Sequence, residues 1–444
     1  MLTVKLIHAW RTSVLLLAAG AACDLSSGST WRSKAAGLDS VFTDVTTSAA
    51  DEVVEEAARF RTAVLACASF EEGSLRPVRL ILYRRQQDFA KVAPEGTSVE
   101  GLAAYTCPAY FGSTVVLCLS HNNTEHLSIQ DRHVIRHEMV HALYGDVCEH
   151  QPRWFREGFA EYLAMIGYYH GFVVLGRPNP DAVSKLQRQP GWSLADLLEV
   201  DSKVRLDSAQ FAEGIYASGW AFAHYCLHSG DPQLRGSYFA LADLAAGSRQ
   251  IDESMIRWTF GCTIVELQDR IASYLARGSF QLRPVKLGVE PPPPPTPWRL
   301  LSSQERDYLL TEIKVWSRLP ANGAKLLRTQ HAGSTLDGEP WLGLAFLARR
   351  LGDKGQLLDL LVDAASHERK NSLVYAEAAR LAWEKSRMVQ GPAASFWSDQ
   401  AKALATRATQ LEPRCGLAKR ILGEISTRLT EDSNQARSTG QEMQ

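Results

Sequence analysis

Two histidines stand four residues apart in the segment "HEMVH", with a glutamate directly after the first of them. Residues four apart lie on the same face of an α-helix. A helix would therefore aim His137 and His141 at one point, where two neutral imidazoles can supply half of a tetrahedral zinc shell. Glu138 lies one position further round the helix, close to such a metal without binding it, where a general base for water would stand.

A second pair of acidic residues follows the histidines. Glu157 and Glu161 are also four apart, in a segment that begins with Pro152, a residue favoured in the first turn of a helix. Fifteen residues separate His141 from Glu157, and Gly158 can let this second helix approach the first closely. One carboxylate can bind the metal, and the other can accept the spare N–H of a ligating histidine. The spacing alone leaves open which glutamate does which.

Other elements must position these side chains. Ser128 can cap the histidine helix, with Asp131 three residues further on. Apolar residues at helical spacing predict a helix over residues 50–70, and alternation of apolar and basic residues predicts a strand over residues 76–85. The pattern over residues 128–278 is mostly helical.

The segment "PRWFREGFAEY" at residues 152–162, together with "HEMVH", resembles the gluzincin metallopeptidases, particularly the peptidase-MA-like proteins. The resemblance covers about residues 50–280. It implies a zincin-like metallopeptidase domain, in which a small sheet and active-site helices hold Zn²⁺. It also implies that Glu157 is the third zinc ligand and that Glu161 is the outer partner of a ligating histidine.

The resemblance extends to the segment "IYASG", where it implies that Tyr216 stabilises the oxyanion. A phenol suits this role because it donates a hydrogen bond to developing charge at neutral pH. His224 and Tyr225 are alternatives in the same segment. Members of this group often bind peptide along the edge strand beside the active-site helix, which here would be residues 114–119.

The expected activity is zinc-dependent hydrolysis of peptide bonds in a peptide or protein substrate, with Glu138 as general base toward zinc-activated water. The "G-x-M-E-N" box of related aminopeptidases is absent from the sequence, which favours an endopeptidase. The alternative is a lipoprotein scaffold whose peptidase fold is idle and whose C-terminal repeats bind a protein partner. A net charge of −1 without a basic stripe argues against a nucleic-acid partner.

The N-terminus has the features of an export signal. Lys5 and Arg11 precede or flank a short apolar run, which predicts a signal peptide over residues 1–22. This run ends in "AAGAAC" and resembles a bacterial lipoprotein signal, so Cys23 would carry a lipid and residues 23–45 would form the anchor and a flexible tether. We therefore expect the protein in the bacterial cell envelope, attached to the membrane through the lipid alone. Plain secretion is the alternative.

Export makes disulfides chemically accessible. The segment "CPAYFGSTVVLC" predicts a hairpin with Gly112 and Ser113 as a two-residue turn. That register places Cys107 opposite Cys118, at about 5.5 Å between the two Cα atoms, within disulfide range. Two buried free thiols are the alternative.

The 444 residues suffice for more than one domain, and the expected fold class is α+β. The zincin-like domain is expected over residues 46–285, followed by a Pro-rich linker over residues 286–298 that contains "EPPPPPTP". An all-α helical-repeat domain is expected over residues 299–430, because "WLGLAFLARRLGD" and "YAEAARLAWEKS" are offset by 34 residues and resemble tetratricopeptide repeats. Residues 431–444 are expected to form a disordered tail.

Overall fold

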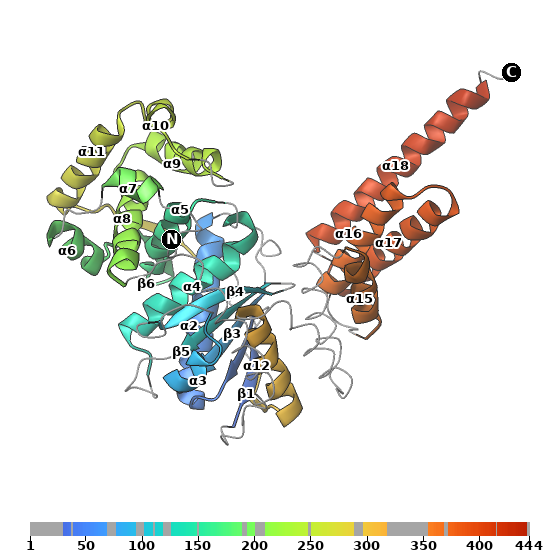
Figure 1. The fold of residues 1–444 in the computed structure, drawn as a ribbon, viewed down its shortest axis with the longest axis horizontal. Helices are drawn as coiled ribbons and strands as arrows, with labels where there is room; N and C mark the ends of the chain where they lie inside the picture. The colour runs from blue at the N-terminus through green and yellow to red at the C-terminus, as the bar shows by residue number, and fades with distance from the viewer. Residues whose placement is uncertain are drawn as a thin grey trace, which may run out of the picture.

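A computed structural model of the chain (Figure 1) describes residues 30–36, 39–68, 77–94, 102–109, 112–118, 126–148, 151–188, 193–199, 209–246, 250–287, 296–317, 354–367, 372–413 and 415–441. The expected signal peptide over residues 1–22 and the expected lipidation site Cys23 lie outside the described residues. Across the described ranges, no helix is both long and apolar enough to cross a membrane.

The first sheet has six strands in the order β4-β5-β3-β2-β1-β9. These strands are β1 Arg32–Ala36, β2 Asp39–Thr43, β3 Val78–Tyr83, β4 Ala104–Ala109, β5 Gly112–Cys118 and β9 Arg299–Leu300. Strand β3 runs parallel to both β2 and β5, whereas the other pairs are antiparallel. Leu80 and Leu82 of β3 belong to one hydrophobic core and Ile81 and Tyr83 to another, as expected for a central strand buried on both faces.

Helices cover both faces of this sheet (Figure 1). On one face pack α2 (Thr47–Ala68) and α4 (Ile129–Cys148). On the opposite face pack α3 (Gln86–Ala90) and α12 (Ser303–Ser317). The helix and the strand predicted upstream of the histidine motif are confirmed as α2 and β3.

The expectation of a flexible tether over residues 23–45 is wrong for most of its second half, which forms the strands β1 and β2. Trp31 and Val41 are buried, and β2 pairs with β3 in the middle of the sheet. Beyond the Pro-rich segment, β9 pairs with β1, and α12 packs on the same sheet. Residues 299–317 therefore belong with the first sheet and not with the expected repeat domain.

The β4–β5 hairpin has a different register from the predicted one. Gly112 and Ser113 lie in β5 itself, and Cys107 pairs with Thr114. Cys118 lies four residues further along β5, which is about 13 Å at a rise of about 3.3 Å per residue. Both cysteines are free thiols, so the predicted Cys107–Cys118 disulfide is wrong.

The edge of the sheet next to α4 is also a different strand. Strand β5 is flanked by β4 and β3, so the predicted edge strand over residues 114–119 is wrong. Strand β4 forms the edge and contacts α4.

A second, smaller sheet follows α5 (Arg153–Ala164). It consists of β6 (Gly167–Tyr169), β7 (Phe172–Leu175) and β8 (Arg283–Lys286), strands that the mostly helical pattern did not predict. Helix α8 (Ala209–His228) packs against α5. The remaining helices of this region are α6 Pro180–Arg188, α7 Leu194–Glu199, α9 Pro232–Leu244, α10 Glu253–Phe260 and α11 Ile264–Arg277.

The described C-terminal region is helical, as predicted. Its helices are α15 Lys354–His367, α16 Ser372–Met388, α17 Pro392–Leu411 and α18 Gly416–Gln441. Helix α16 packs against α15, α17 and α18, while the first predicted repeat segment, near residue 341, lies outside the described residues. Helix α18 continues to Gln441, so the disordered tail expected from residue 431 is corrected to a helix over most of its length (Figure 1).

Candidate metal centre

Helix α4, which carries the histidine motif, begins with the predicted cap. The Ser128 hydroxyl accepts a hydrogen bond from the Asp131 backbone N–H at 3.0 Å. In return, the Asp131 carboxylate accepts from the Ser128 backbone N–H at 3.0 Å. Two backbone donors at the helix start are thereby satisfied, which fixes where the helix begins and hence which of its residues face the sheet.

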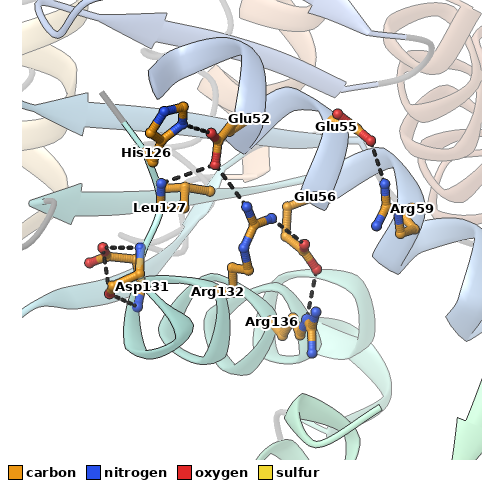
Figure 2. Close-up of polar contacts among 10 residues, drawn as sticks. Glu52, Glu55, Glu56, Arg59, His126, Leu127, Asp131, Arg132 and Arg136 are labelled. Carbon is orange, nitrogen blue, oxygen red and sulfur yellow. Dashed lines mark hydrogen bonds and ion pairs between the residues drawn. The ribbon is translucent and has the colours of Figure 1, made fainter. Parts of the chain in front are cut away.

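An ionic cluster around the buried Glu56 attaches α4 to α2 (Figure 2). Glu56 of α2 is only 1% exposed, and it accepts hydrogen bonds from Arg132 at 3.0 Å and from Arg136 at 2.7 Å. Arg136 also donates to the carbonyls of Ala164 at 3.3 Å and Ile166 at 2.9 Å, at the end of α5. The guanidinium of Arg136, the residue directly before His137, thus connects α4 with α2 and with the end of α5.

Helix α5 is positioned by a close contact with α8. A Cβ atom added at Gly158 would lie 2.4 Å from the backbone oxygen of Gly219, so only glycine fits there. The close approach that Gly158 permits is therefore to α8, and not to α4 as the sequence suggested. Trp154 and Phe155 are buried beside it and pack the same helix into the core.

Three ligand atoms from α4 and α5 converge on one point. His137 Nε2 lies 3.1 Å from His141 Nε2 and 3.4 Å from a Glu157 carboxylate oxygen, which lies 3.2 Å from His141 Nε2. Atoms about 2.1 Å from a tetrahedral zinc ion lie about 3.4 Å from one another. The residues present therefore fit a divalent ion, and they are among the described His/Glu groups that could hold one.

The electrostatics of this cluster favour positive charge between its members. Burial alone would lower the pKa of His137, but the carboxylates of Glu157 and Glu161 outweigh it and raise that pKa well above its usual range. Burial would likewise raise the pKa of Glu157, but His141 and His137 hold it well below its usual range. Positive charge is therefore favoured where the three ligand atoms meet, as it would be for a bound metal cation.

Glu161 lies behind His137, as the resemblance implied. One of its oxygens is 2.9 Å from His137 Nδ1, the ring nitrogen that does not face the other ligands. Two further residues, neither assigned a role from the sequence, reach the same carboxylate: His133 at 3.2 Å and Asn179 at 3.2 Å.

Glu138 faces β4, the edge strand. The hydroxyl of Thr106 donates to a Glu138 carboxylate oxygen at 2.6 Å. No sequence pattern predicts this contact, because Thr106 and Glu138 are 32 residues apart and lie on different elements. The carboxylate is thus held in one orientation next to, and not within, the group of three ligand atoms.

Tyr216 lies on α8 and joins the cluster, whereas its alternatives do not. The ring of Tyr216 lies edge-to-face with the ring of His137, with 5.6 Å between centroids. His224 is fully buried and bonds Tyr274 and the Gly176 carbonyl, and Tyr225 is also buried. Burial, and then the nearby carboxylates, raise the pKa of Tyr216, so that its hydroxyl remains a hydrogen-bond donor at neutral pH.

Comparison with known proteins adds no family assignment. No protein-family model matches the chain. A search of the curated proteins likewise finds no match.

Proposed function

We propose that this chain is a zinc-dependent peptidase with a zincin-like fold, acting outside the cytoplasm. One observation carries the proposal: His137, His141 and Glu157 present three ligand atoms at mutual distances of 3.1, 3.2 and 3.4 Å. Those distances suit zinc, for which two imidazoles, one carboxylate and an open fourth position are typical of catalytic sites. Another divalent ion of similar size would find the same ligands.

His137, His141 and Glu157 would hold the ion, which would supply a Lewis acid and lower the pKa of water at the site. Glu138 would accept the proton of the attacking water and pass it to the leaving amine. Thr106 supports this role because its hydroxyl, 2.6 Å from one Glu138 oxygen, fixes the carboxylate. Tyr216 would donate a hydrogen bond to the oxyanion, and its ring contact with His137 supports this role.

The substrate proposed is an extended peptide. Strand β4 is the edge of the sheet, and it carries Thr106 next to Glu138. A peptide that adds to this edge by main-chain hydrogen bonds would run past the general base. We favour cleavage at internal peptide bonds of the substrate, because the sequence of this protein lacks the "G-x-M-E-N" aminopeptidase box.

Export and anchoring remain part of the proposal on the sequence of residues 1–23. Fractionation of cells that express wild type or Cys23→Ser tests them. We expect wild-type protein in the membrane fraction and the variant in the soluble extracytoplasmic fraction, whereas equal distribution of the two would refute a lipid on Cys23.

Digestion of a peptide library separates the peptidase from an idle scaffold. We expect cleavage that a zinc chelator abolishes and added zinc restores. Glu138→Gln should bind zinc like wild type but cleave about 10²–10⁴-fold more slowly, because it keeps the shape and loses the proton acceptor. Glu55→Gln is the matched control, since Glu55 lies on α2 and its ion-pair partner among the described residues is the exposed Arg59. Unchanged cleavage in Glu138→Gln, or none in wild type, would end the proposal.

A further inference from the structure

The carboxylate of Glu161 collects contacts from three parts of the fold. His137 Nδ1 lies 2.9 Å from one oxygen, while His133 Nε2 and Asn179 Nδ2 each lie 3.2 Å from the other. The Glu161 side chain is 11% exposed and the His133 side chain 19% exposed. A buried carboxylate with donors on both oxygens has one orientation, and that orientation determines how it meets His137.

His133 reaches Glu161 from α4, the same helix as His137 and His141. It precedes His137 by one turn of α4, so both rings project from one face of that helix. A carboxylate only accepts hydrogen bonds, so the His133 ring nitrogen that faces Glu161 is the donor of this contact.

Asn179 reaches Glu161 from the start of α6. Its side-chain oxygen accepts the backbone N–H groups of Asp181 and Ala182, both at 3.1 Å, and so caps that helix. Because the oxygen is committed to the cap, the amide nitrogen must face away from the helix, toward Glu161. The cap therefore orients a donor for the metal centre.

We infer that His133 and Asn179 are positioning residues that set the metal affinity of this centre by holding Glu161 against His137. Glu161 keeps Nδ1 of His137 protonated, which leaves Nε2 to present its lone pair to the ion. Without its two outer donors, the Glu161 side chain can adopt other rotamers and leave His137 unsupported. This inference rests on the proposed function only in requiring that an ion binds His137, His141 and Glu157.

Zinc affinity, measured by competition with a chromophoric chelator, tests the inference without any measurement of cleavage. His133→Phe keeps a ring but loses the donor, and should bind zinc about 10–100-fold more weakly than wild type. His133→Gln restores an amide donor and should recover most of the affinity. Thermal unfolding of the metal-free proteins should give similar melting temperatures for the two variants. A purely structural role of the ring would not produce different zinc affinities at equal thermal stability.

A second pair of variants tests Asn179 in the same assay. Both Asn179→Ser and Asn179→Asp keep a helix cap. Asn179→Ser removes the donor and should weaken zinc binding, and Asn179→Asp should weaken it further, because a second carboxylate would face Glu161.

The outcomes are distinct. Wild-type affinity in His133→Phe would overturn the inference, as would a second zinc ion per chain that this substitution removes, because His133 would then be a ligand and not a support. If wild type binds zinc but cleaves no peptide, the proposed function fails and the inference stands or falls on the affinities. If wild type binds no zinc, both fail.

Discussion

Replacing Glu56 with glutamine removes the buried charge that attaches α4, the helix that carries His137 and His141, to α2. Glu56 is 1% exposed, and the side chains of its partners Arg132 and Arg136 are 34% and 14% exposed. The substitution preserves side-chain shape, so what changes is the charge and one acceptor oxygen. Arg136 would then lie in the interior without its carboxylate.

The magnitude follows from what each arginine retains. Breaking a buried ion pair by removing one partner costs about 3–5 kcal/mol. Arg132 keeps a contact to Glu52 at 2.7 Å, and Arg136 keeps the carbonyls of Ala164 and Ile166. We therefore expect a loss near the lower limit, about 3 kcal/mol of unfolding free energy.

Urea unfolding followed by tryptophan fluorescence measures this loss, with Glu55→Gln as the matched control. Glu55 is one residue away on α2, and its pair with Arg59 has side chains 68% and 44% exposed (Figure 2). An exposed pair of this kind contributes about 0.5 kcal/mol or less. Equal losses in Glu55→Gln and Glu56→Gln would refute the reasoning that the Glu56 cluster holds α4 in place.

Two further predictions concern packing and pH. Gly158→Ala should destabilise the fold by about 1–3 kcal/mol, because the added Cβ would meet the backbone of Gly219. In the control Gly236→Ala, the added Cβ has nothing within 4 Å, and the substitution should stabilise α9 slightly. Thermal unfolding of the two variants measures the difference. Burial lowers the pKa of His224 and of His228 to about 4, against about 6.5 in an unfolded chain. As pH falls from about 7.5 to about 5, the unfolded chain therefore takes up protons that the folded chain does not, and stability falls by about 2 kcal/mol per histidine. Urea unfolding of His228→Gln should show a correspondingly smaller fall, and an unchanged fall would contradict the burial of a neutral ring.

The convergence of His137, His141 and Glu157 could be predicted from the sequence, because it depends on local geometry. Helical periodicity places residues four apart on one face, and the Ser128 cap fixes where α4 begins. The proline before α5 marks the second helix in the same way. Which glutamate faces the histidines needed a resemblance, since spacing treats Glu157 and Glu161 alike.

The supporting residues could not be predicted in this way, because they reach the site through tertiary contacts. Thr106 is 32 residues from Glu138, His133 is 28 from Glu161, and Asn179 is 18 from Glu161. A lone histidine one turn before a motif, or an asparagine before a proline, is explained equally well by a solvated face or a cap. Only the packed helices show that these side chains meet.

The errors in the fold have a similar origin. Each of β1 and β2 has five residues, too few for alternation to stand out in a segment rich in serine and alanine. In the β4–β5 hairpin, glycine was taken as the turn, whereas pairing with β3 on the other side commits Gly112–Cys118 to a strand. Register is decided by which neighbours a strand has, and a single hairpin does not specify them.

The central claim is that His137, His141 and Glu157 bind one ion together, and zinc stoichiometry tests it most directly. Equilibrium dialysis with elemental analysis should find about one zinc per chain in wild type. It should find the same in the control His126→Ala, whose side chain is 70% exposed and bonds Glu52. His141→Ala should retain almost none while keeping its fold by circular dichroism. Zinc retained by folded His141→Ala at the wild-type level, or absent from wild type, would contradict the account.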